Sequence, residues 1–181
     1  MSFLSKDYKP LQPSGGGYMK FAEGENRIRI LASDKDDPPT AIVGMEAWTT
    51  DAEGNRKPVR CQPGQKLTGD FEEDPKEFWA MLVWDYQADQ VRILSITQKG
   101  IQGEILSLKQ DPEWGDLREY DLSIIKTGKG LETRYNVVPK PKKELPKETL
   151  QVIADAEINL MALFSGDDPF APISGAKKDP F

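Results

Sequence analysis

The sequence predicts a mainly β fold with one or two helices and flexible termini. Short segments that alternate apolar and polar side chains recur through the middle of the chain, as strands with one buried face do. Only two segments repeat apolar residues at helical spacing. Both ends of the 181-residue chain are rich in proline, glycine and charged residues, which favours flexible ends.

The composition is that of a single domain with tails. A chain of 181 residues suits one domain, and 38% hydrophobic with 30% charged residues indicates that part of it lies outside a packed core. No apolar run reaches the length of a membrane span, and the start "MSFLSKDYKP" lacks the apolar stretch of a signal peptide. We therefore expect a cytoplasmic protein with no membrane partner.

The residues that are missing exclude several kinds of site. The chain has no histidine and one cysteine, Cys61, so neither an internal disulfide nor a usual zinc ligand set can form. The stretch "SGGGYM" lacks the Lys-Ser/Thr of a phosphate-binding loop. Most carboxylates lie in runs typical of solvated loops, such as "DFEEDPKE". We predict no catalytic residue, no metal and no cofactor, and hence a protein that is not an enzyme.

The first half of the chain reads as an arm followed by strands. Residues 1–17 contain three consecutive glycines and little apolar periodicity, which indicates a flexible N-terminal arm. Strands are predicted in "NRIRILA" and "AIVGMEAWTT", and a turn through Glu53, Gly54 and Asn55 leads to a return strand ending in "RKPVRC". The segments "KEFWAMLVWDY" and "QVRILSI" should form a hairpin across "QAD".

The second half alternates helices with a further hairpin. From Thr97 the apolar residues Ile101, Ile105 and Leu108 recur at helical spacing until "DPEWGD". A hairpin is predicted for "EYDLSIIKTG" and "LETRYNVVP" around "GKG". After the linker "PKPKKELPKE" we expect one amphipathic helix over residues 146–164 and a disordered acidic tail over residues 165–181.

This order of elements fits a small five-stranded Greek-key barrel, the OB-fold, over residues 18–145. A half-open sandwich with a covering helix is the rival architecture. One face of an OB barrel commonly binds oligonucleotides, although a fold alone does not establish a function.

The aromatic stretch "KEFWAMLVWDY" carries large side chains on both of its faces. In a strand, Phe78, Trp84 and Tyr86 share one face and Trp79 lies on the other. One explanation is a central strand buried on both sides. The other is that one face stacks on a flat ligand from outside.

Basic residues cluster in two stretches despite the net charge of −6. One stretch lies between residues 56 and 66 and the other between residues 126 and 143, and both fall on predicted hairpins. Binding of single strands without sequence preference needs a positive track for phosphates and aromatic faces for bases. The candidate DNA-binding residues are Trp48, Arg56, Lys57, Arg60, Trp79, Trp84, Tyr86, Lys126, Lys129, Arg134 and Tyr135.

Several linked motifs resemble a family of bacteriophage single-stranded-DNA-binding proteins: "YMKFAEGENRIRIL", "EFWAMLVWDY", "ILSITQKGIQ" and "DPEWGDLREYDLSIIKTGKGLETRYNVVPKP". The resemblance covers roughly residues 18–145. It implies an OB-fold that coats single-stranded DNA during DNA replication, recombination or repair in the host cell cytoplasm. The chain lacks the ligands of the zinc-bearing members, so the resemblance implies no metal.

The end of the chain, "SGDDPFAPISGAKKDPF", resembles the tail of bacterial single-stranded-DNA-binding proteins. Such a tail offers an apolar anchor and carboxylates to a replication or recombination partner. The predicted partner-binding residues are Asp167, Asp168, Phe170, Asp179, Pro180 and Phe181. The alternative is a disordered end whose last residue is Phe by chance.

A second function stays open at this point. An OB-like module whose aromatic face meets protein would act as an interaction adaptor in a replication or recombination complex. Nothing in the sequence specifies an oligomeric state.

Overall fold

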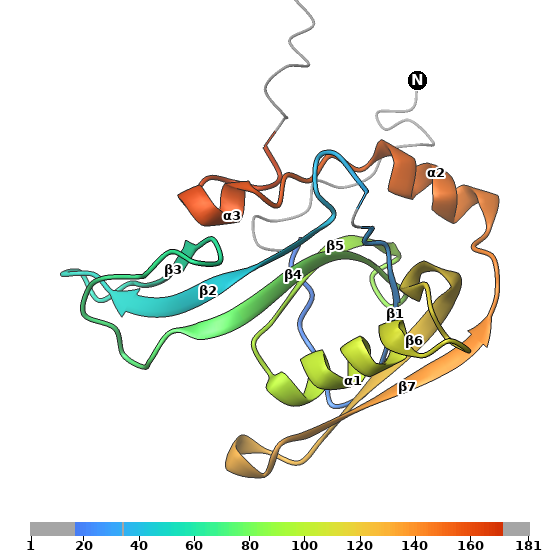
Figure 1. Cartoon of the computed structure of the whole chain (residues 1–181), viewed down its shortest axis with the longest axis horizontal. Helices are drawn as coiled ribbons and strands as arrows, with labels where there is room; N and C mark the ends of the chain where they lie inside the picture. Colours follow the sequence, from blue (N-terminus) through green and yellow to red (C-terminus); the bar gives the residue numbers. More distant parts are fainter. Residues whose placement is uncertain (1–16, 34, 172–181) are drawn as a thin grey trace, which may run out of the picture.

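The computed structural model describes residues 17–33 and 35–171, which form a mainly β fold with three α-helices (Figure 1). The strands are β1 (Gly24–Ile30), β2 (Ala41–Thr50), β3 (Arg56–Cys61), β4 (Lys76–Asp85), β5 (Gln90–Ile96), β6 (Tyr120–Thr127) and β7 (Arg134–Lys142). The helices are α1 (Lys99–Gln110), α2 (Lys147–Asp155) and α3 (Ala162–Ser165). Each segment that the sequence predicts to be a strand forms one.

The strands make one antiparallel sheet in the order β3-β2-β4-β1-β6-β7, with β5 paired to β4 off this path. Strand β4 organises the sheet because it pairs with three others. Residues 79–85 pair with β5 along one edge, while the other edge pairs first with β2 and then with β1. The sheet does not close into the five-stranded barrel that the sequence predicts, and it contains seven strands.

Two apolar clusters lie on opposite faces of this sheet. The first packs the inner face, including Ile28, Met81 and Leu122, against Ile101 and Ile105 of α1. The second packs the outer face of β2, β4 and β5 against the C-terminal segment around α3. In Figure 1, α1 and α3 accordingly lie on opposite sides of the β2–β4 ribbon.

The aromatic strand β4 is therefore a central strand buried on both faces. Phe78 and Ala80 are fully buried in the outer cluster, and Val83 is fully buried in the inner one. Most of its apolar surface is enclosed by α1 on one side and by residues 156–171 on the other, which is the first of the two explanations above.

The single helix predicted over residues 146–164 is wrong. Helix α2 ends at Asp155 with no buried residue, and an extended segment precedes the short helix α3. In that segment Ile158 and Leu160 are buried and the exposed Glu157 and half-buried Asn159 alternate with them. The chain leaves the helix because it crosses the outer sheet face in a conformation with a period of two residues.

The first part of the predicted disordered tail is also packed. Pro169 is buried, and the ring of Phe170 meets the ring of Tyr18 edge-on with centroids 5.5 Å apart. The space over Gly17 is filled by Phe170, because a Cβ atom there would lie 2.2 Å from its Cζ. Phe170 is thus part of the folded body. The predicted tail residues Asp179, Pro180 and Phe181, and the arm before Gly17, lie outside the described residues.

Candidate nucleic-acid interface

The β2–β3 hairpin presents an exposed indole with a cation on its face. Trp48 is 37% exposed, and the guanidinium of Arg56 lies 4.9 Å from the centroid of its ring. The register places Arg56 opposite Thr50, so it reaches Trp48 diagonally across the two strands. Arg56 also forms an ion pair with Glu72 at 2.9 Å. Arg56 therefore covers one face of the Trp48 ring and is paired with Glu72, and the exposed part of the indole remains as a stacking surface.

The other two basic candidates on this hairpin differ in accessibility. Lys57 is exposed. Arg60 is held inside the fold, because its Nε donates to Glu46 at 2.8 Å and its guanidinium lies over the ring of Phe78. Arg60 therefore braces the hairpin against β4, and we remove it from the set of DNA-contacting residues.

The β6–β7 hairpin carries the second basic group. Lys129 and Arg134 are exposed at its tip, and Lys126 lies half-buried opposite Tyr135 on the paired strand. No ion pair joins these three cations to another residue in the described part of the chain. The turn needs Gly128, whose φ of 79° is left-handed and whose Cβ position is blocked by the Glu132 carbonyl.

Tyr135 is only partly available for stacking. Its ring packs on Phe21 with centroids 5.5 Å apart and adjoins the inner apolar cluster, so one side belongs to the core.

In Figure 1 the β2–β3 and β6–β7 hairpins extend to the same side of the molecule, with the first turn of α1 between them. The hairpins thus place aromatic and basic candidates on one side of the fold.

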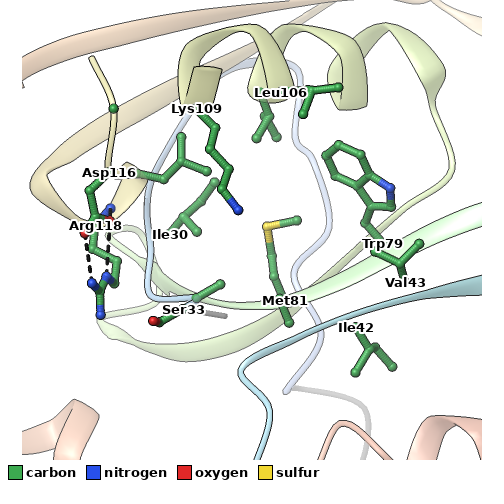
Figure 2. A pocket seen from close by; sticks show the side chains of 15 residues that line it. Ile30, Ser33, Ile42, Val43, Trp79, Met81, Leu106, Lys109, Asp116 and Arg118 are labelled. Atoms are coloured by element: carbon green, nitrogen blue, oxygen red, sulfur yellow. Dashed lines mark hydrogen bonds and ion pairs between the residues drawn. The ribbon is translucent and has the colours of Figure 1, made fainter. Parts of the chain in front are cut away.

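Trp79 borders a cavity rather than an open sheet face. The cavity, of about 520 Å³, lies between α1, the start of β2 and the loop before β6. Figure 2 shows Trp79, Met81 and Leu106 around it, with the Asp116–Arg118 ion pair at one end. Its lining is mainly apolar. The Trp79 Nε1 donates to Glu77 at 2.9 Å, which fixes the indole.

Trp84 is not a stacking residue. It is 3% exposed, and its backbone pairs with Arg29 of β1 and Val91 of β5. Because so little of the side chain is exposed, no face of its ring is open to a nucleobase. This candidate is withdrawn.

Tyr86 belongs to a group of charged residues around Asp121, which we call the Asp121 cluster. Asp121 is fully buried, and Arg29, 1% exposed, donates to its Oδ1 at 2.8 Å. The Tyr86 hydroxyl donates to the same oxygen at 2.6 Å. Arg27 donates to Oδ2 at 3.0 Å, and the Lys143 amine lies 3.6 Å from that oxygen. Three cations thus surround one carboxylate.

The surroundings of the Asp121 cluster shift the pKa values of Asp121 and Tyr86. Burial acts to raise the pKa of Asp121, but the hydrogen bonds from Tyr86 and Arg29 and the nearby positive charge outweigh it and hold the pKa below its ordinary value. Burial and the hydrogen bond to Asp121 raise the pKa of Tyr86 to about 12. At neutral pH the carboxylate is ionised and the phenol is neutral.

The role predicted for the Tyr86 ring also changes. Arg27 lies 5.5 Å and Lys143 5.8 Å from its centroid, so two cations contact the ring. Sequence reasoning missed Asp121 as a site residue, and it placed Lys143 only at the end of the basic stretch between residues 126 and 143. The available signal was Arg27 and Arg29 on one strand face, together with an aspartate inside the apolar run "YDLSII".

Comparisons with protein-family models, with curated proteins and with solved structures find no match to this chain. Among residues 17–33 and 35–171, no group of three or more acidic, cysteine or histidine side chains could hold a metal ion. In the same ranges, no helix has the length and apolar character needed to span a membrane. The resemblance to phage single-stranded-DNA-binding proteins therefore stays a prediction from the sequence.

Proposed function

We propose that this protein binds single-stranded DNA without sequence specificity and coats strands exposed during phage DNA replication, recombination or repair. The observation that carries the proposal is the exposed Trp48 ring with the Arg56 guanidinium on its face. Every base has a face that can stack on an indole, and an arginine beside it can meet the adjoining phosphate. The cations of the β6–β7 hairpin would contact further phosphates of the same strand.

The strand pairing supports an OB-like, partly open arrangement for this purpose. Strands β1 and β2 together pair with β4, β4 pairs with β5, and α1 leads to the β6–β7 hairpin, which returns to β1. This order resembles the meander, helix and closing hairpin of an OB-fold, in which oligonucleotides commonly bind between the hairpin loops. This likeness is an analogy at the level of the fold, and the proposed function rests on the residues of the site.

Substituting Trp48 by Ala should weaken binding to oligo-dT by about 1–3 kcal/mol, because one stacking surface is lost. Trp48→Phe, which keeps a ring, is the matched control and should retain most of the affinity. Equilibrium binding measured with a fluorescently labelled oligonucleotide compares the two, and thermal melting should show similar stability for both. Equal affinity of the wild type and the Ala variant would remove Trp48 from the interface.

Reversing a charge on the β6–β7 hairpin should flatten the salt dependence of binding. For single strands, the slope of log affinity against log salt changes by about 0.7 for each phosphate contact. We expect Lys129→Glu to weaken binding and to reduce the slope by about that amount or more. Lys147→Glu, an exposed lysine on α2, is the charge-matched control. Identical slopes for the two variants would exclude a specific role for Lys129.

The cavity beside Trp79 favours a second candidate function, a protein-interaction adaptor. Its apolar lining and the exposed Val43 and Leu106 at its edge fit an apolar side chain of a protein partner. Oligonucleotide binding separates the candidates. An adaptor without DNA contacts would leave labelled oligo-dT unbound at every salt concentration, whereas the proposed function requires steep, salt-dependent binding.

A further inference from the structure

We infer that Arg27 and Lys143, held by Tyr86 and the buried Arg29–Asp121 pair, form a binding site for one backbone phosphate of the single-stranded DNA. This inference rests on the proposed function and names a contact outside the two hairpins. The site lies where β1 and β6 meet the segment after β7.

The Asp121 cluster has an excess of positive charge. Asp121 supplies one negative charge, and Arg27, Arg29 and Lys143 supply three positive charges within 4 Å of it. The neighbouring acids have other partners. Glu119 pairs with Lys142 at 3.1 Å, and Asp85 pairs with Arg92 at 3.6 Å.

Glu25 is the remaining acid on this face of β1, and its carboxylate accepts a hydrogen bond from the Ser123 hydroxyl. It lies two residues before Arg27 and therefore offsets part of the positive charge. Counted with both Asp121 and Glu25, the three cations still leave one more positive than negative charge at this site.

Two of the three cations are accessible to solvent. Arg29 is enclosed, and its other donors bind the carbonyl oxygens of Arg118 and Lys143 at 2.9 and 3.0 Å. Arg27 and Lys143 differ from it, since their side chains are 38% and 51% exposed. A guanidinium has five N–H donors and an ammonium three, so both groups can bind Asp121 and still donate to an anion from solvent.

The two exposed cations are held in position before any ligand binds. Asp121 fixes Arg27 through Nε and Nη2, and the Tyr86 ring lies close to both Arg27 and Lys143. Side chains that are ordered before binding lose less conformational entropy when the ligand arrives. Tyr86 is thus a positioning residue, and its hydroxyl and ring link the buried carboxylate to the two exposed cations.

These features fit a phosphodiester group. Its two unesterified oxygens can accept hydrogen bonds from a guanidinium and an ammonium together, and such charge-assisted bonds are the strong ones. Single-stranded DNA supplies one such group per nucleotide, so a strand bound at Trp48 or Lys129 brings further phosphates to the surface of the protein.

The experiment measures oligo-dT affinity over a range of salt concentrations for the wild type, Arg27→Gln, Lys143→Gln and the control Lys142→Gln. Lys142 adjoins Lys143, is similarly exposed at 47%, and pairs with Glu119 outside the Asp121 cluster. We expect Arg27→Gln and Lys143→Gln each to weaken binding several-fold and to reduce the salt slope by about 0.7, with little change for Lys142→Gln.

Lys143→Gln keeps the test valid if Arg27→Gln lowers stability, because the Lys143 amine is exposed and only 3.6 Å from the carboxylate. Wild-type binding with unchanged slopes in both glutamine variants would overturn this site and leave the proposed function intact. Equal losses from Lys142→Gln and Lys143→Gln would also overturn it, as an effect of general charge. A wild type that does not bind oligo-dT would overturn the proposed function itself.

Discussion

Substituting Asp121 by Asn is expected to lower the free energy of unfolding by about 3–5 kcal/mol, the usual cost of removing one partner of a buried ion pair. The substitution leaves the guanidinium of Arg29 enclosed without a counter-ion, since Arg29 is 1% exposed and Asp121 fully buried. Arg27 and Lys143 would add to the repulsion. Urea denaturation at pH 7 followed by circular dichroism measures the change.

The control for this result is Asp116→Asn. Asp116 also forms an arginine pair, with Arg118 at 2.8 Å, but both side chains are well exposed to solvent. Exposed ion pairs contribute about 0–1 kcal/mol, so this variant should unfold nearly as the wild type does. Two equally small changes would show that the Asp121 cluster adds little to stability, and would remove the rigid base that the phosphate site requires.

The same residue gives stability a pH dependence of defined sign. The folded-state pKa of Asp121 lies below its ordinary value of 3.8, so the unfolded chain binds its proton first as the pH falls. The stabilisation is complete above about pH 5 and is lost progressively as the pH falls through 4 and below. The Asn variant lacks this group and should lose less stability over that interval.

The sequence predicts the strands well because their signal is local. The segment "NRIRILA" alternates polar and apolar residues as far as Ile30 and forms most of β1, while "AIVGMEAWTT", which is rich in β-branched residues, forms β2 over the same ten residues, Ala41–Thr50. Strand β4 likewise begins at Lys76, as its sequence indicates. A period of two residues is a property of the segment itself and does not depend on which strand lies beside it.

The Asp121 cluster depends on pairing between distant segments. Arg29 and Asp121 are 92 residues apart in the chain, and the register of β1 against β6 brings them together. Composition gave no reason to pair them. The same limit applies to Trp79 and Trp84, which lie on opposite faces of β4. The burial of each ring depends on elements that are remote in the sequence.

The sequence of the C-terminal segment is compatible with two patterns, helical spacing and alternation of apolar and polar residues. The apolar residues of the 146–164 region fit a helix by spacing, yet Ile158 and Leu160 also alternate with Glu157 and Asn159. Tertiary packing favours the second pattern, because an extended chain buries Ile158 and Leu160 on the apolar outer face of β4. The helical conformation of this segment is therefore only marginally stable by itself, and the extended conformation becomes favourable when the segment packs on a sheet.

Removing residues 156–181 should abolish cooperative unfolding of the protein. The deletion takes away the buried side chains of Ile158, Leu160 and Leu163 and uncovers Phe78 and Ile93 on the outer sheet face. Each fully buried side chain of this size contributes about 1.5–3 kcal/mol, so the three that are lost amount to much of the 5–15 kcal/mol that stabilises a typical domain. Thermal melting and binding of a hydrophobic dye measure the change.

The matched truncation removes only residues 172–181 and keeps the whole packed segment, including Pro169 and Phe170. It should melt within a few degrees of the full chain, since the contacts of the outer apolar cluster are all retained. Because it also removes Asp179, Pro180 and Phe181, it tests the proposed tail separately: loss of a replication or recombination partner with unchanged melting would assign recruitment to those last residues. Similar melting of the two truncations would show instead that the segment over β4 adds little stability.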